Sequence, residues 1–281
     1  NPNVLAMTAT PIPRTLSMTL HGDMDISIID ELPKNRIPII TKVVNEERLE
    51  SIYAFMKKEI NDKKQCYIVF PIIEESEKLD VEAAETGYHN IKKNIFPEYN
   101  VGFLHGKMKK DKRDEQMKLF IKGEIDILVS TTVVEVGIDN PNATVMMIEN
   151  AERFGLTQLH QLRGRIGRGT KQSYCILLQR KDTTIASHRL KVMENTSNGF
   201  KISDEDLQLR GPGEFFGKRQ HGYMKTKIAD IAKDGDIIKE ARNLAFDIVL
   251  KDYDLRAIKH QKIKKELLHR YSNMLEFIDI G

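Results

Sequence analysis

The stretch that decides the fold is residues 126–169, which read DILVSTTVVEVGIDNPNATVMMIENAERFGLTQLHQLRGRIGRG. Two apolar runs, 127–129 and 145–148, have the length and composition of buried strands. A polar loop with Ser-Thr-Thr and Gly-Ile-Asp separates them, and an arginine-rich segment follows. This order predicts a parallel α/β sheet whose loops gather at its carboxyl edge. We therefore expect the hydroxyl groups and the arginines at that edge, where they would suit phosphate.

The arginine segment, Gln-x-x-Gly-Arg-x-Gly-Arg at 161–168, is the more specific half of the stretch. Arg165 and Arg168 are three residues apart, which predicts that they share one face of a helix. Guanidinium groups fork onto phosphate oxygens and stabilise the charge that develops on a leaving γ-phosphate. Gly164 and Gly167 weaken a helix, so a close backbone approach is expected there. The alternative is a basic, solvated helix with flexible glycines, which the preceding Ser-Thr-Thr and Gly-x-Asp elements disfavour.

The same stretch resembles the fifth and sixth motifs of superfamily 2 helicases, which lie in the second of two RecA-like lobes. The resemblance implies backbone contacts to nucleic acid for Thr131 and Thr132, nucleotide contacts for Gly137, Asp139 and Gln161, and catalytic contacts to the ATP phosphates for Arg165 and Arg168.

Two further segments strengthen the resemblance and narrow it. Residues 8–15 read TATPIPRT and residues 22–33 read GDMDISIIDELP. Both are similar to the RecG family of fork-reversing helicases and, less closely, to the transcription-repair coupling translocase. The resemblance makes residues 1–35 the end of the first lobe and the interlobe linker, with Thr8 and Thr10 at the DNA. It also places His105, in a His-Gly-Lys-Met loop, on the DNA backbone.

Residues 36–180 carry the alternating pattern of the second lobe. Strand-like runs at 38–44, 66–73, 101–104 and 173–179 alternate with helical patterns at 46–63, 81–96 and 109–122. Such an order predicts right-handed parallel units. The predicted fold is an α/β, RecA-like parallel sheet flanked by helices.

Residues 181–281 are predicted to be mostly helical. Helical patterns cover 183–195, 236–253 and 257–274, and a helix start is predicted at 203–206. Residues 207–222, with four glycines and a proline, predict an irregular loop. This part resembles the helical hairpin and hook loop of the family's translocation motif. That resemblance implies translocation roles for Arg210, Gly211, Gly213, Arg219 and Gln220.

Composition sets broader limits on the chain. Of its 281 residues, 40% are hydrophobic and 30% are charged, with a net charge of +3. Residues 107–118 hold six Lys or Arg against three acids, and residues 251–271 hold seven against three. Cys66 and Cys175 lie in apolar runs, which predicts buried free thiols in a reducing compartment and disfavours a zinc site. No apolar run is long enough for a membrane span.

A phosphate-binding loop is missing from the sequence. It contains no Gly-x-x-x-x-Gly-Lys-Ser/Thr, and no Asp-Glu pair is followed by the histidine of a Walker B box. The chain also starts at Asn1-Pro2 without Met. We therefore expect a fragment of a longer protein, with ATP and Mg²⁺ held mainly by an upstream lobe and no metal ligands here. The fragment alone is predicted to be inactive.

The resemblance implies an ATP-dependent DNA helicase that remodels branched DNA by fork reversal and Holliday-junction branch migration. The implied partners are branched or duplex DNA and single-strand binding protein, for a monomer in the bacterial cytoplasm. Two alternatives stay open at this point: a transcription-repair coupling translocase, and a non-enzymatic nucleic-acid-binding module that has kept a RecA-like lobe.

Overall fold

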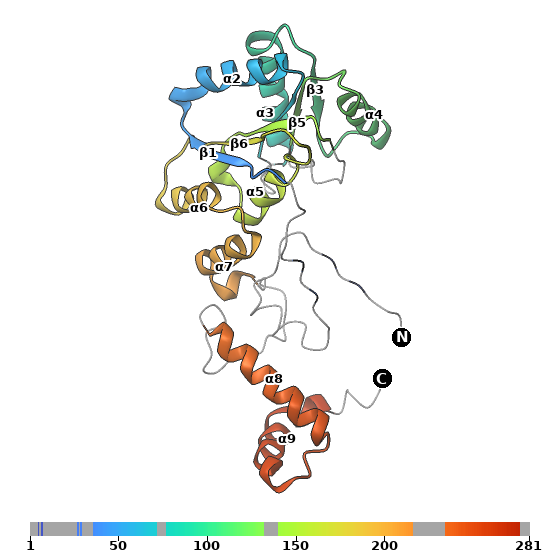
Figure 1. Ribbon diagram of the computed structural model, residues 1–281, viewed down its shortest axis with the longest axis vertical. Coiled ribbons are helices and arrows are strands. Elements are labelled where there is room, and N and C mark those ends of the chain that lie inside the picture. Colours follow the sequence, from blue (N-terminus) through green and yellow to red (C-terminus); the bar gives the residue numbers. More distant parts are fainter. Residues whose placement is uncertain are drawn as a thin grey trace. The chain divides into compact units, whose positions relative to one another are not determined.

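A computed structural model describes Leu5, Met7, Ser27, Ile29 and residues 36–71, 77–131, 140–215 and 234–275. These residues fall into two compact units, one holding residues 36–215 and the other residues 234–275. The break in packing follows Phe215. The domain boundaries at residues 35 and 180 stay predictions. The first unit carries the sheet and is called the lobe below (Figure 1).

Six parallel strands form the sheet of the lobe, in the order β1-β6-β5-β2-β4-β3. This confirms the predicted parallel α/β class. The strands are β1 (Ile40–Val44), β2 (Gln65–Val69), β3 (Val101–Leu104), β4 (Ile127–Ser130), β5 (Ala143–Ile148) and β6 (Tyr174–Leu178). Central strands β2, β4 and β5 are buried along their whole length, as expected of a sheet covered on both faces.

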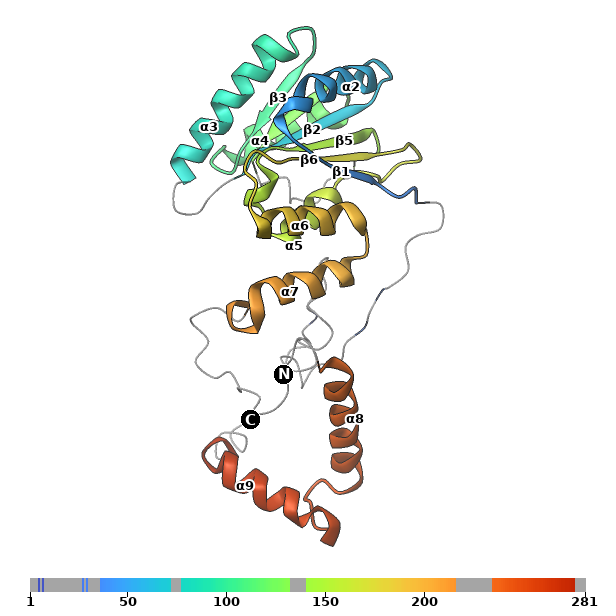
Figure 2. The ribbon, with the colours of Figure 1, turned by 90° about the vertical axis from the view of Figure 1, so that its left-hand side faces the viewer.

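Helices cover both faces of the sheet (Figure 2). The helices of the lobe are α2 (Leu49–Asn61), α3 (Glu77–Asn90), α4 (Lys110–Ile121), α5 (Leu156–Arg163), α6 (Thr184–Asn195) and α7 (Gly199–Phe215), with short helical segments η1 (Glu46–Arg48), η3 (Ile91–Ile95) and η5 (Ala151–Arg153). One core joins α2 and the α3–η3 helix to the sheet, and the other joins α4, α5, α6 and α7 to its opposite face. Alternate residues of each strand enter alternate cores, as the period of two requires.

β2 shows this division of the two cores. Cys66 and Ile68 point into the core under α2 and α3, while Tyr67 and Val69 point into the core under α4 and α5. Cys66 and Cys175 are buried free thiols, which confirms the prediction for both. Each large apolar side chain buried this way stabilises the fold by about 1.5–3 kcal/mol.

Two predictions for the helical region were wrong. The helix expected to start at 203–206 starts at Gly199, because the side chain of Asn198 accepts hydrogen bonds from the N–H groups of Phe200 (2.9 Å) and Lys201 (3.4 Å). The loop expected at 207–222 is helical as far as Phe215, since α7 packs against α5 and α6 through buried residues such as Ile202 and Leu207. The rest of that predicted loop lies outside the described residues.

The second unit consists of α8 (Gly235–Lys251), η6 (Ile258–His260) and α9 (Gln261–Leu275), which confirms two predicted helices. The carboxylate of Asp252 holds the connection between them. It accepts bonds from the N–H groups of Arg256 (2.8 Å) and Ala257 (2.9 Å), and one of its oxygens lies 2.8 Å from Nδ1 of His260.

Candidate functional site: an arginine turn and a polar strand edge

Arg165 and Arg168, which were predicted to contact the ATP phosphates, lie after a helix rather than on one. α5 carries Gln161 and ends at Arg163, and its end is capped by Gly164, whose N–H bonds to the carbonyl of His160 at 3.0 Å. Residues 164–168 form a turn, called the arginine turn below. The predicted shared helix face for Arg165 and Arg168 is therefore wrong. α5 ends at Arg163, and Gly167, near the end of the turn, has φ of +71°, a left-handed conformation that glycine adopts readily and that cannot continue a helix.

Close packing places the arginine turn at the amino-terminal edge of the sheet. A Cβ on Gly167 would lie 2.8 Å from Cγ1 of Ile39, which precedes β1. A Cβ on Gly169 would lie 2.7 Å from the carbonyl oxygen of Pro141, which precedes β5. The predicted close backbone approach is confirmed at Gly167, but the predicted position at the carboxyl edge is wrong. A helix that follows a strand returns the chain to the edge where the strand began.

The two arginine charges act on the same buried group. Burial raises the pKa of the Tyr67 phenol to about 12, whereas the charges of Arg165 and then Arg168 lower it. Arg165 is half-buried and Arg168 is exposed, with its Nε 3.3 Å from the carbonyl oxygen of Gly164. Two forked cations on one side of the lobe suit a phosphate chain.

A third arginine of the motif, Arg163, was missed by the sequence argument. Its side chain is buried, and its guanidinium bonds to Thr41, His160 and two backbone carbonyls. In sequence, Arg163 cannot be distinguished from the less buried Arg165 and Arg168, so no sequence signal marks it as buried.

Three polar side chains end β3 and β4 at the opposite, carboxyl-terminal edge. Ser130 and Thr131 are 0% exposed, and His105 follows β3 in register with Thr131, whose N–H bonds to the carbonyl of Leu104 at 3.1 Å. Ser130 Oγ, Thr131 Oγ1 and His105 Nδ1 are buried, and none has a hydrogen-bond partner in the described part of the chain. Buried polar atoms without partners are costly, so they indicate a ligand contact. Ser130 was missed, although it opens the Ser-Thr-Thr run.

The surroundings of His105 lower the pKa of its imidazole. Burial is the main cause that lowers its pKa, the carboxylate of Glu85 raises it, and the ammonium of Lys107 lowers it. A neutral imidazole can donate one hydrogen bond and accept another.

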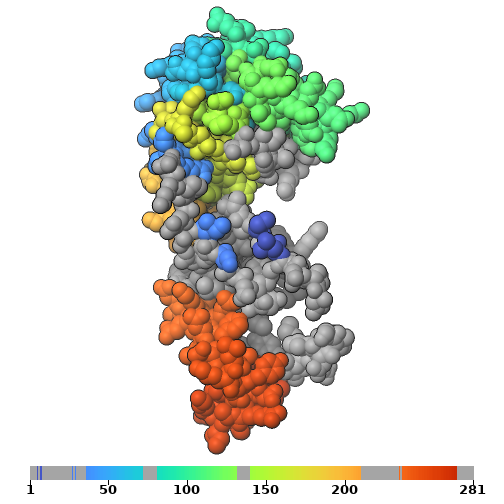
Figure 3. Space-filling model, turned by 45° about the vertical axis from the view of Figure 1, so that its right-hand side comes forward, coloured from blue at the N-terminus to red at the C-terminus, as the bar shows by residue number. Residues whose placement is uncertain are grey.

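Exposed cations on α4 follow this loop. Lys109, Lys110, Lys112 and Lys118 are exposed, and α4 lies at the surface of the lobe, coloured green in Figure 3. Together with the polar ends of β3 and β4, α4 offers a basic surface to a phosphate backbone.

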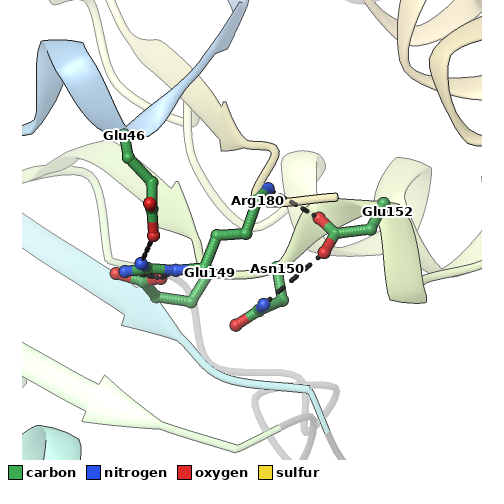
Figure 4. A network of polar contacts seen from close by, with 5 residues as sticks. All are labelled: Glu46, Glu149, Asn150, Glu152 and Arg180. Carbon is green, nitrogen blue, oxygen red and sulfur yellow. Dashed lines mark hydrogen bonds and ion pairs between the residues drawn. The ribbon is translucent and has the colours of Figure 1, made fainter. Parts of the chain in front are cut away.

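A second polar cluster ties together the ends of β1, β5 and β6 (Figure 4). Arg180 bonds to Glu46 and donates from Nε and Nη2 to one oxygen of Glu149, each at 3.1 Å. Its backbone N–H donates to Glu152 at 3.2 Å. Burial, and then the carboxylate of Glu152, raises the pKa of Glu149 to about 7. The sequence argument missed this cluster, whose members lie up to 134 residues apart.

Several predicted site residues fall outside the described residues. These are Thr8, Thr10, Thr132, Gly137, Asp139, Arg219 and Gln220. Three residues with a predicted role in translocation, Arg210, Gly211 and Gly213, lie within α7.

Neither a metal cluster nor a membrane span is present in the described residues. Among them, no group of three or more His, Cys, Asp and Glu side chains could hold a metal ion. No helix in those parts of the chain has the length and hydropathy to cross a membrane.

Two known protein families match this chain, one over most of the sheet and the arginine turn and the other over the helical region. Residues 46–170 match the helicase conserved C-terminal domain, and residues 196–275 match domain 3, C-terminal, of the ATP-dependent DNA helicase RecG. The chain belongs to the RecG family. The first match spans the strand edge and the arginine turn, and the second spans α7 to α9.

Curated RecG helicases are similar over almost the whole chain. The Synechocystis sp. protein is 48% identical over 98% of this chain, and the Bacillus subtilis protein is 47% identical over 95% of it. This chain spans 33% and 39% of those two relatives, so it corresponds to about a third of a RecG helicase.

A solved RecG structure also matches, one described as bound to a three-way DNA junction. It is 41% identical with a TM-score of 0.66, over 82% of this chain and 30% of that one. The two chains are therefore similar in three-dimensional structure as well as in sequence.

Proposed function

We propose that the complete protein is an ATP-dependent DNA helicase that remodels branched DNA, by reversal of stalled forks and branch migration of Holliday junctions. One observation carries the proposal: a helicase C-terminal domain and a RecG domain 3 follow one another on a single chain. The related structure in complex with a three-way junction supports the choice of branched DNA.

The arginine turn is proposed as this chain's contribution to ATP turnover. Arg165 and Arg168 would bind the phosphates and stabilise charge on the leaving γ-phosphate, which Mg²⁺-ATP supplies when bound. Two arginine charges that reach one phenol fit a polyanion. Gln161, Gly137 and Asp139 are proposed nucleotide contacts. The Mg²⁺ ligands are proposed to lie with the phosphate-binding loop, whose motif this sequence lacks.

The ends of β3 and β4 are proposed as the DNA contact. Hydroxyl groups of Ser130 and Thr131 and the imidazole of His105 would bind phosphate oxygens of the backbone, which would satisfy their buried polar atoms. Thr132, Thr8 and Thr10 are proposed to extend the same contact. Phosphate contacts carry no sequence information, so binding would be insensitive to base sequence and sensitive to salt.

The helical region is proposed to convert lobe movement into movement along duplex DNA. In this role Arg210, Gly211 and Gly213 would belong to the moving helix α7, and Arg219 and Gln220 to the segment that follows it. We further propose a monomer in the bacterial cytoplasm, with single-strand binding protein as an additional partner.

The test uses the complete protein on a synthetic three-way junction and on linear duplex of equal length. The expected result is ATP hydrolysis that the junction stimulates, with conversion of the fork into reannealed arms. The 281-residue chain alone should hydrolyse no ATP, since it lacks a phosphate-binding loop. Turnover by this chain, purified free of contaminants, contradicts the proposed division of the site.

Two outcomes would support the alternatives instead. Tight binding to RNA polymerase, with displacement of a stalled polymerase, would indicate a transcription-repair coupling translocase. Junction binding without any ATP turnover would indicate a non-enzymatic module.

A further inference from the structure

Arg163 is a buried cation whose partners are not carboxylates. Its side chain is 3% exposed. Nη1 donates to the carbonyls of Met193 (2.8 Å) and Thr196 (2.9 Å) and to Oγ1 of Thr41 (3.3 Å), and Nη2 donates to Nδ1 of His160 (3.1 Å). Burial of an isolated charge is unfavourable, so a guanidinium held this way requires several good partners.

Two of these partners belong to the end of α6. Its last carbonyls have no partner within the helix and carry a partial negative charge, which a cation stabilises. Met193 lies in the last turn of α6, and Thr196 opens the connection to α7. Arg163 therefore joins α5 to the point where α6 passes into α7.

The same residue lies at the start of the arginine turn. Gly164 follows Arg163 directly, and the far side of the turn rests on Ile39 through Gly167. Thr41, which also binds Arg163, lies two residues after Ile39 at the start of β1. The turn is thus held between β1 on one side and the α6–α7 connection on the other.

We infer that Arg163 is a positioning residue that couples the arginine turn to the α6–α7 pair, so that displacement of one displaces the other. The inference rests on the proposed function, because its consequence is transmission between ATP phosphates and the helical region. A rigid guanidinium with four bonds suits this role better than a flexible ammonium.

His160 completes the coupling as an acceptor. Burial, followed by the charges of Arg163 and Arg36, lowers the pKa of His160 to about 4. Its imidazole is therefore neutral near pH 7, and Nδ1 can accept the bond from Nη2 of Arg163.

The main test is Arg163→Met in the complete protein, because methionine fills similar space without charge or donors. We expect kcat for ATP to fall by about tenfold or more, roughly 1.4 kcal/mol of barrier, with KM for ATP nearly unchanged. Base pairs unwound per ATP hydrolysed should also fall. Arg163→Lys should restore part of the kcat and little of the unwinding per ATP.

Arg189→Met is the matched control. Arg189, on α6, also donates to two backbone carbonyls, those of Phe154 and Glu152, both at 3.0 Å. These carbonyls lie at the other end of α5. Arg189→Met should lower the melting temperature without a change in the ratio of unwinding to ATP hydrolysis.

His160→Leu covers the case in which Arg163→Met fails to fold. It removes one of the four partners of Arg163, so a smaller loss of unwinding per ATP is expected. The inference is overturned if the Arg163 or His160 variant loses ATPase and unwinding in the same proportion as Arg189→Met. If the wild-type protein neither hydrolyses ATP nor unwinds forks, the proposed function is overturned, and the inference about Arg163, which rests on it, falls with it.

Discussion

The two edges of one sheet differ in how they hold their polar groups. At the carboxyl edge, Ser130 and Thr131 are buried, and their hydroxyls have no partner among the described residues. At the amino edge, Arg168 is exposed, and close packing at Gly167 sets the path of the backbone. The carboxyl edge thus holds unpaired hydroxyl groups at the ends of strands, and the amino edge holds arginine side chains on a turn.

This difference bears on the two proposed ligands, DNA at the carboxyl edge and the ATP phosphates at the amino edge. The strands fix the positions of the buried hydroxyl groups, so a phosphate would reach them only after the residues around them move. The arginines lie on a turn that Arg163 and Ile39 hold from two sides. A ligand at one edge can affect the other only through movement of the whole sheet or of the helices that span it.

The largest expected effect comes from removal of an arginine of the turn. Arg165→Ala or Arg168→Ala in the complete protein should lower kcat by about 10³–10⁵, because arginines of this kind stabilise transition-state charge. ATP and DNA affinity should change little. The exposed Arg153, at the carboxyl edge, is the control, and Arg153→Ala should keep full activity. A loss of less than about tenfold would move the catalytic role elsewhere.

Thr131→Val tests the other edge. Loss of a hydrogen bond to a charged phosphate should weaken DNA binding by about 10- to 100-fold, as measured by the DNA concentration for half-maximal ATPase. Thr144→Val is the control, because Thr144 is an equally buried threonine without a hydroxyl partner among the described residues, at the start of β5.

Both threonine variants should raise the free energy of unfolding by about 1 kcal/mol, since each replaces a buried unpaired hydroxyl with a methyl group. Equal DNA affinity for the two would mean that Thr131 has no role in binding.

Gly167→Ala tests whether packing positions the arginine turn. Its φ of +71° and the 2.8 Å approach to Ile39 should together cost about 2–4 kcal/mol of unfolding free energy. Gly123→Ala separates these causes, because Gly123 has φ of +78° and nothing within 4 Å of an added Cβ. A cost of about 1–2 kcal/mol is expected there. Equal costs for both would leave no contribution from Ile39.

The smallest expected effects are opposite pH dependences at the two edges. Glu149 has a pKa raised to about 7, so its unfolded form releases the proton first and stability falls as pH rises from about 4.5 to 7. His160 has a pKa lowered to about 4, so stability falls as pH drops from about 6.5 to 4. Each slope is at most about 1.4 kcal/mol per pH unit.

Thermal unfolding of Glu149→Gln and His160→Gln between pH 4.5 and 6.5 measures this contrast. The difference in unfolding free energy between Glu149→Gln and wild type should shift in favour of the variant as pH rises. The difference between His160→Gln and wild type should shift in favour of wild type as pH rises. Parallel curves would show that neither buried group titrates as described.

Sequence patterns predicted the elements of the lobe better than their ends. The apolar runs identified the strands to within a few residues, because buried parallel strands are nearly continuous in hydrophobicity. The arginine segment was placed on a helix because its spacing fits one, whereas α5 ends at Arg163 and Gly167 has a left-handed conformation. Backbone conformation at a glycine depends on its neighbours in space, such as Ile39.

Some residues of the candidate site were predicted from the sequence and others were not. Thr131 and His105 were predicted from the resemblance to a helicase family, and each directly follows a residue of the pair Leu104–Ser130. Arg163 and Arg180 were not, since their partners are distant in sequence and partly backbone carbonyls. Every residue has a backbone carbonyl, so the sequence does not indicate which carbonyl accepts a hydrogen bond from a distant arginine.

The order of the strands has a consequence for synthesis on the ribosome. Among the strands of the described residues, β1 is made first and β6 last, and β1 pairs with β6 alone, with Ile40 aligned with Tyr174. At roughly 5–20 residues per second, the nascent chain must wait several seconds or more before this pairing is available. Until then the apolar edge of β5 that β6 will cover stays open to other chains. A message truncated just before β6 would therefore give an aggregating product rather than a smaller, working lobe.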